Sequence, residues 1–169
     1  MTAAALALGG NLDDPRAHLR EAVAGLSDHP DVVVTAVSSL WRTEAVGGPA
    51  QPDYLNAVVL VETTLDSRGL LEFAHTLEER AGRVREARWG PRTLDVDLLD
   101  VDGQRSDDPQ LTLPHPRAHQ RAFVMVPWAE VAPDSVLSPA GTEPRTVGQW
   151  AASITGQRGT LLEEGPWWR

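Results

Sequence analysis

The chain has 169 residues, a formal net charge of −9 and neither cysteine nor lysine, and its length suits a single domain over residues 1–169. The acidic balance argues against nonspecific nucleic-acid binding, which depends on neutralising many phosphates at once. The missing cysteine and lysine exclude disulfides, thiolate chemistry, Schiff-base mechanisms and a phosphate-binding loop that ends in Gly-Lys-Ser/Thr.

The first half of the chain predicts strands and one helix in alternation. The opening AAALAL reads as a buried strand, and an aspartate at position 13 or 14 then caps a helix that begins at Pro15. VVVTAVSSLWRT, residues 32–43, predicts one strand, and YLNAVVLVETTL, residues 54–65, predicts the next. A loop rich in glycine and proline, residues 44–53, joins them.

The second half adds helices and one further strand. A helix is predicted from Ser67, and a strand over about 93–100 ends at a turn. The segment AFVMVPWAEVAPD predicts only a short helix, because Pro127 interrupts it, and a last helix is expected near 146–154. The order βαββαβ predicts an α+β, ferredoxin-like fold with a mostly antiparallel sheet and helices packed on it in α/β/α layers.

Positive charge is concentrated in one short segment. Between Arg80 and Arg92 there are five arginines and one acid, Glu86, so this segment carries +4 in an acidic chain. Guanidinium groups pair bidentately with phosphate oxygens. The density suits one polyphosphate rather than a duplex.

Two acids follow these arginines in RWGPRTLDVDLL, residues 88–99. Alternate side chains of a strand share a face, so Asp95 and Asp97 are expected on one face, with Val96 and Leu98 directed into the core. The strand pattern alone fits a solvated outer face as well as a metal site. The arginines favour the metal site, because Mg²⁺ binds one or two carboxylates and completes its shell with water and substrate phosphates.

Other residues of this region have two interpretations each. Trp89 either closes over a bound ring system or packs against the sheet. His115 and His119 have the i, i+4 spacing of a metal pair, but Pro116 opposes a continuous helix there. A phosphate or nucleotide contact from His115 and Arg121 is therefore favoured over a zinc site.

Four blocks together resemble the 6-hydroxymethyl-7,8-dihydropterin pyrophosphokinases of folate biosynthesis: RWGPRTLDVDLL, LALGGNL, TEAVGGPAQPDYLNAVV and LTLPHPRAHQRAFV. They run in the family's order from about residue 5 to 135. The resemblance implies a 2-amino-4-hydroxy-6-hydroxymethyldihydropteridine diphosphokinase, which transfers pyrophosphate from Mg-ATP to 6-hydroxymethyl-7,8-dihydropterin and releases AMP. The tail, residues 156–169, falls outside the blocks, and its tryptophans either cap the core or form a contact surface.

The resemblance also implies roles for individual residues. The implied catalytic residues are Arg83, Arg92, Asp95 and Asp97, and the last two would hold two magnesium ions. The implied ATP contacts are Leu71, Glu78, Arg83, Arg85, Arg92, Leu98, Thr112, His115 and Arg121. The implied pterin contacts are Thr43, Val46, Tyr54, Asn56, Trp89 and Phe123. Taken alone, Glu78 would also suit a salt bridge on a helix surface, and Asn56 a satisfied polar position at a strand end.

Three positions depart from the family's pattern: Gly10, Ala45 and Gln110. Gln110 stands where some members present an arginine to the nucleotide, so that contact is not carried over. We expect a monomer with no nucleic-acid or membrane partner. A cytoplasmic location is expected because no apolar run spans a bilayer and MTAAALALGG lacks the basic flank of a signal peptide. The alternative is a noncatalytic ferredoxin-like module that binds a nucleotide or RNA.

Overall fold

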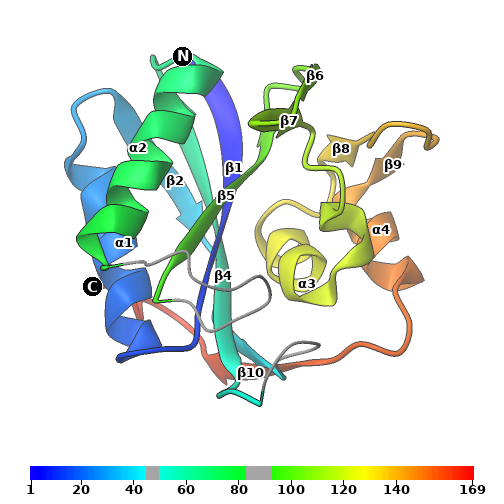
Figure 1. The fold of residues 1–169 in the computed structure, drawn as a ribbon. Coiled ribbons are helices and arrows are strands. Elements are labelled where there is room, and N and C mark those ends of the chain that lie inside the picture. The colour runs from blue at the N-terminus through cyan, green and yellow to red at the C-terminus, as the bar shows by residue number, and fades with distance from the viewer. Residues whose placement is uncertain (45–49, 83–92) are drawn as a thin grey trace.

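A computed structural model describes residues 1–44, 50–82 and 93–169, which form a central sheet with helices on both faces (Figure 1). Within these ranges the sheet has six strands: β1 Thr2–Gly10, β2 Val32–Val37, β3 Leu40–Thr43, β4 Tyr54–Thr63, β5 Asp95–Val101 and β10 Gly159–Glu163. The helices are α1 Pro15–Asp28, α2 Ser67–Arg80, η1 Ala118–Gln120 (a 3-10 turn), α3 Ala122–Val131 and α4 Val147–Ser153. Two short antiparallel pairs complete the list: β6 Ser106–Asp108 with β7 Leu111–Leu113, and β8 Val136–Leu137 with β9 Arg145–Thr146.

The sheet confirms the predicted fold class. Its strands lie in the order β10-β3-β4-β1-β5, with β2 also paired to β4, and all these pairs are antiparallel. The elements from β1 to β5, with β2 and β3 one after the other along the same edge of β4, therefore form the predicted βαββαβ unit. Helices α1 and α2 cover one face and α3 with α4 the other, which gives the predicted α/β/α layers (Figure 1).

The helix starts follow from their capping residues. The Asp14 side chain accepts the N–H of Ala17 at 3.3 Å, directly before Pro15. Asp66 accepts the N–H of Gly69 at 2.7 Å and starts α2. At α4, Thr146 and Gln149 bind each other's backbone N–H in a capping box. These starts agree with the sequence prediction.

The prediction of one strand over residues 32–43 is wrong, because Ser38 and Ser39 divide it into β2 and β3. The N–H and the hydroxyl of Ser39 both donate to the carboxylate of Glu130 on α3, and the Oγ to Oε2 distance is 2.6 Å. A backbone N–H that donates to a helix side chain cannot also donate to a neighbouring strand. Pairing with β4 is therefore interrupted at this point.

Helix α3 occupies the segment in which a short helix is predicted, but it continues through Pro127, so the predicted interruption there is wrong. Proline removes an N–H that would have bonded to the carbonyl of Phe123. However, Val124, Met125 and Trp128 are buried together with Pro127. Because tertiary packing supplies most helix stability in proteins, this burial maintains the helix despite the lost hydrogen bond.

Strand β5 contains a β-bulge. The partner of Leu6 on β1 is Leu98, whereas the partner of Ala5 is Asp100, so Leu99 is an extra residue. Leu98 packs in the core formed with α1 and α2, and Leu99 packs in the core formed with α3 and α4. Consecutive residues of a strand point to opposite faces, so these two neighbours pack in opposite cores, and the extra residue shifts the alternation beyond them.

The C-terminal tail adds a strand and a core residue to this structure. Strand β10 pairs antiparallel with β3. The side chain of Trp167 is 2% exposed, and its Nε1 donates to the carbonyl oxygen of Ser38 at 2.9 Å. Of the two interpretations of the tail tryptophans, Trp167 follows the one in which it caps the core.

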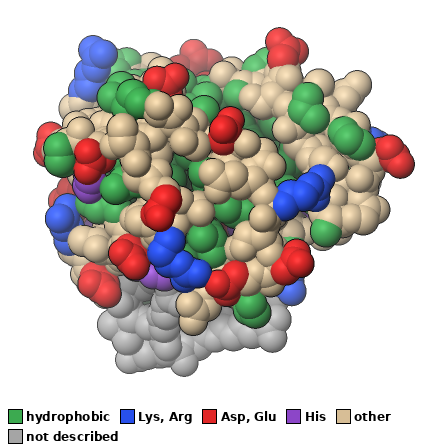
Figure 2. Space-filling view, turned by 90° about the horizontal axis from the view of Figure 1, so that it is seen from above, with side chains coloured by type: hydrophobic (Ala, Val, Ile, Leu, Met, Phe, Trp, Pro, Cys, Tyr) green, Lys and Arg blue, Asp and Glu red, His purple; other side chains and the backbone are tan. Residues whose placement is uncertain are grey.

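Acidic and basic side chains are interspersed on the surface seen from above in Figure 2. This view shows no continuous basic stripe of the kind that follows a nucleic-acid backbone on the part of the chain that it colours. Among the helices that the structure describes, none has the length and apolar character needed to cross a bilayer.

Candidate active site

A cleft of about 1410 Å³ lies at the end of the sheet where β1 ends and β5 begins. Its described walls come from residues 7–9 of β1, the end of β3 with the start of β4, the start of β5, the segment from His115 to Phe123, and residues 156–160. These segments are far apart in sequence, so folding is what brings them to one place.

Asp95 and Asp97 both line this cleft. Val96 and Leu98 are buried, whereas Asp95 is half-buried and Asp97 exposed, which confirms the predicted alternation. The described residues contain no group of three or more acids or histidines that could enclose a metal. The two carboxylates on the cleft wall would fit Mg²⁺, which binds one or two carboxylates and would take its remaining ligands from water and substrate phosphates.

Arg121, the residue between η1 and α3, lines the cleft. Burial lowers the pKa of Arg121, while the negative charges of Asp97 and Asp95 act in the opposite direction. An arginine side chain remains a cation throughout the physiological range. Phosphate groups bound between this guanidinium and a cation held by the two acids would be neutralised from both sides.

His115 is fixed at the edge of β5. The backbone N–H of His115 donates to the carbonyl of Leu99 at 2.8 Å, and its ring Nδ1 accepts the backbone N–H of Arg117 at 3.1 Å. Burial, together with the charges of Arg121 and Arg117, lowers the pKa of His115 to about 4, so the ring is neutral near pH 7. A neutral ring that accepts at Nδ1 carries its proton on Nε2, which can then donate to a phosphate oxygen.

Four predicted pterin residues line the same cleft: Thr43, Tyr54, Asn56 and Phe123. Asn56 is 4% exposed, and its Nδ2 donates to Oγ1 of Thr43 at 2.7 Å. A Cβ built on Gly9 of the neighbouring strand would lie 3.1 Å from Oδ1 of Asn56. Glycine at position 9 thus leaves room for this amide, whose contact with a pterin stays a prediction.

Four of the predicted ATP residues are not among the described residues that line the cleft: Leu71, Glu78, Leu98 and Thr112. Leu98 is buried in the core with α1 and α2, and Leu71 packs against the same core. Glu78 is 4% exposed, and its Oε2 accepts the N–H of Val96 at 3.1 Å. Their roles in binding ATP stay predictions.

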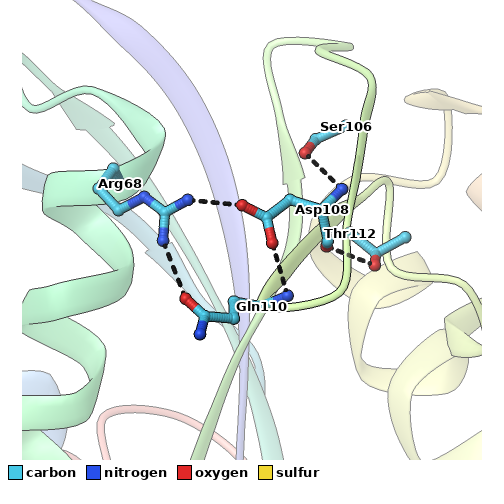
Figure 3. A network of polar contacts seen from close by, with 5 residues as sticks. All are labelled: Arg68, Ser106, Asp108, Gln110 and Thr112. Atoms are coloured by element: carbon cyan, nitrogen blue, oxygen red, sulfur yellow. Dashed lines mark hydrogen bonds and ion pairs between the residues drawn. The ribbon is translucent and has the colours of Figure 1, made fainter.

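Thr112 lies on the β6–β7 hairpin, which makes polar contacts with Arg68 of α2 (Figure 3). Arg68 donates to Oδ2 of Asp108 at 2.7 Å and contacts Oε1 of Gln110 at 3.5 Å. Asp108 also accepts the N–H of Gln110 at 2.9 Å, and the Thr112 hydroxyl donates to the Asp108 carbonyl at 3.0 Å. The hairpin is thereby held beside the helix that carries Leu71.

The remaining predicted site residues lie outside the described residues: Val46, Arg83, Arg85, Trp89 and Arg92. Conversely, the cleft contains residues that the sequence analysis did not name. Arg42, Arg117 and Arg158 are basic, and Gln157 lies beside Arg158 in the tail. Arg117 stands within the block LTLPHPRAHQRAFV, so it could have been found, whereas no motif marked the tail.

The model of the 7,8-dihydro-6-hydroxymethylpterin-pyrophosphokinase (HPPK) family matches residues 5–133. Three similar curated proteins carry the name 2-amino-4-hydroxy-6-hydroxymethyldihydropteridine pyrophosphokinase. The Methylorubrum extorquens protein is 46% identical over 137 residues, which cover 81% of this chain and 87% of that protein. The Bacillus subtilis protein is 44% identical over 126 residues, 75% of each chain. The Mycobacterium tuberculosis protein is 40% identical over 167 residues, 91% of this chain and 85% of that protein.

Solved structures agree with the fold. Plasmodium falciparum HPPK-DHPS wild type with pteroate has a TM-score of 0.64 at 11% identity, covering 89% of this chain and 44% of that one. A structure of HPPK-DHPS in complex with substrates has a TM-score of 0.65 at 10% identity, covering 90% and 45%. This chain thus spans less than half the length of those two chains, and at such identities the likeness concerns the fold alone. The family match and the curated relatives show that the chain belongs to the 7,8-dihydro-6-hydroxymethylpterin-pyrophosphokinase family.

Proposed function

We propose that this protein is a 2-amino-4-hydroxy-6-hydroxymethyldihydropteridine pyrophosphokinase, which acts in tetrahydrofolate biosynthesis. The hydroxymethyl oxygen of the pterin attacks the β-phosphorus of ATP and loses its proton. The bond from that phosphorus to the oxygen it shares with the α-phosphate breaks, and AMP leaves. The observation that supports this best is the pair Asp95 and Asp97 in one cleft with Arg121 and His115.

In this proposal each end of the cleft binds one part of the substrates. Asp95 and Asp97 would hold Mg²⁺, two ions in all, and bound Mg²⁺ would neutralise the phosphate charge. Arg121 and the neutral His115 bind phosphate oxygens, together with the catalytic arginines Arg83 and Arg92. Catalysis then depends on positioning and charge neutralisation rather than on a covalent intermediate.

The pterin lies at the start of β4. Thr43 and Asn56 orient the amide and amine edge of its ring, because a side-chain amide can donate and accept at once. Tyr54 and Phe123 contact the two faces of the ring. We further propose a monomer that acts in the cytoplasm without nucleic-acid or membrane partners. The family match favours this enzyme over the noncatalytic module.

Release of AMP from ATP, Mg²⁺ and 6-hydroxymethyl-7,8-dihydropterin tests the proposal. The wild type should release AMP only when all three are present, and Asp97→Ala should lower turnover by at least about a hundredfold. Glu62→Gln is the matched control, since Glu62 is an exposed acid on β4 that does not line the described cleft. A wild type that releases no AMP, or an Asp97→Ala variant as active as the control, would contradict it.

A further inference from the structure

The side-chain amide of Gln157, in the C-terminal tail, forms hydrogen bonds with the backbone on both sides of Arg121. Its Oε1 accepts the N–H of Ala122 at 3.1 Å. Its Nε2 donates to the carbonyl oxygen of Gln120 at 2.8 Å. One planar amide, which offers a donor and an acceptor together, thus holds the two peptide groups that flank the Cα of Arg121.

The other polar groups of these two peptides are bonded to η1 and α3. The N–H of Arg121 donates to the carbonyl of Ala118 in η1 at 3.1 Å. The carbonyl of Arg121 accepts the N–H of Met125 in α3 at 2.9 Å. With the contacts of Gln157, both the N–H and the C=O of each flanking peptide are bonded. The backbone angles of Arg121, and so the direction in which its side chain leaves the chain, are determined by these four contacts.

Local sequence alone would leave this position less well fixed. Arg121 is the residue before α3, and it makes no side-chain cap for that helix. The first N–H groups of a helix need partners from elsewhere, and here Gln157 supplies one at Ala122. Arginine has a long, flexible side chain, so a small rotation of its backbone moves the guanidinium by a larger distance. A guanidinium that must meet phosphates in the cleft of Asp95 and Asp97 depends on this alignment.

We propose that Gln157 is a positioning residue for Arg121, which makes the C-terminal tail a part of the active site. The inference rests on the proposed function, and it adds a segment beyond the residues 5–133 that the family model matches. Gly156, Arg158 and Thr160, which are neighbours of Gln157 in the tail, line the same cleft. The tail therefore supplies both a wall of the cleft and a support for Arg121.

Steady-state kinetics of AMP release test the inference. Gln157→Ala should lower kcat/KM by about ten- to a hundredfold, because a displacement of a substrate-positioning group by about 1 Å lowers the rate by a factor of this size. Gln157→Glu keeps the acceptor for Ala122 but places a carboxylate oxygen against the carbonyl oxygen of Gln120, so its loss should be at least as large as that of Gln157→Ala. Thr146→Ala is the matched control: it removes the cap of α4, and Thr146 is not among the described residues that line the cleft. Its kcat and KM should match the wild type even where its midpoint of thermal unfolding falls as far as that of Gln157→Ala.

A double-mutant comparison separates positioning from a general structural role. If Gln157 acts through Arg121, Gln157→Ala should cause no further loss of activity once Arg121 is alanine. Losses that multiply in the double variant would overturn the inference. A Gln157→Ala variant with wild-type kinetics, or a control with an equal loss, would overturn it as well.

A second measurement does not depend on turnover. In ¹⁵N-labelled protein the Nε–H resonance of Arg121, assigned with Arg121→Lys, should shift or broaden in Gln157→Ala and stay in place in Thr146→Ala. An unchanged resonance in Gln157→Ala contradicts the positioning role. If the wild type releases no AMP, the proposed function fails, and this resonance still decides whether Gln157 orients Arg121.

Discussion

Glu78 on α2 accepts a hydrogen bond from the backbone N–H of Val96, the residue between Asp95 and Asp97. Among the strands that the structure describes, β5 is at an edge of the sheet, so the N–H groups on its outer side need partners from outside the sheet. Glu78 provides such a partner from a carboxylate that is 4% exposed. The helix therefore holds the strand segment from which the two acids reach the cleft.

Glu78→Ala should destabilise the protein by about 1–3 kcal/mol, because it leaves the buried N–H of Val96 without this acceptor. The variant should also lose activity, since the segment that carries the two acids is less well held. Urea unfolding and AMP release measure the two effects. Glu79→Ala is the control, because Glu79 is the exposed neighbour on the same helix. Equal stability of the two variants would disprove the buried role of Glu78.

Gly9→Ala should weaken pterin binding selectively. The new Cβ would lie 3.1 Å from Oδ1 of Asn56, so this amide must move. We expect KM for the pterin to rise by about tenfold, which corresponds to the loss of one good hydrogen bond. KM for ATP should stay unchanged and serves as the internal control. An equal rise in both constants would mean that the substitution disturbs the whole cleft and not one end of it.

His115 should make stability depend on pH. The folded protein lowers the pKa of His115 from 6.5 to about 4, so between these values the unfolded chain binds more protons than the folded one. The contribution is fully present above pH 6.5 and is lost as the pH falls towards 4, by up to about 3 kcal/mol. His115→Asn, which offers an oxygen near the position of Nδ1, should flatten this part of the curve. Urea unfolding at pH 7, 5.5 and 4 checks it, and parallel curves for wild type and variant would refute it.

Among the residues of the tail, substitution of Trp167 should lower the free energy of unfolding the most. Its side chain is 2% exposed and bonded to Ser38, so Trp167→Ala should destabilise the protein by about 3–5 kcal/mol. Trp167→Phe should cost less, because a ring still fills most of the space. Trp168→Phe is the control, since Trp168 is only partly buried against the same core. Urea unfolding that ranks the control equal to Trp167→Ala would refute the core role.

Local signals were sufficient for much of the fold. The helix starts at Pro15, after an aspartate at 13 or 14, and at Ser67 could be predicted from capping and periodicity alone. The division between β2 and β3 could not, because it depends on Glu130, which is 91 residues beyond Ser39 in the chain. Proline likewise predicts an interruption from its own chemistry, whereas the burial that maintains α3 comes from other elements.

The site shows the same limit. The alternation of side chains along a strand was enough to predict that Asp95 and Asp97 share one face. It could not show which residues of other elements face them across the cleft. Gln157 could not be identified, because an amide in an unmarked tail acquires its role only when β10 pairs with β3 and brings it to residues 120–122. Residues that hold a site in place from distant parts of the chain leave no local pattern.

The extra residue at Leu99 also separates the two halves of β5 from each other. Under strict alternation, residue 101 would point to the same side as Asp95 and Asp97. The bulge shifts the phase, so Val101 packs with α1 and α2 instead. Substitutions at Asp95 and Asp97 can therefore change the chemistry at the start of β5, while Val101 at its end stays packed in the core.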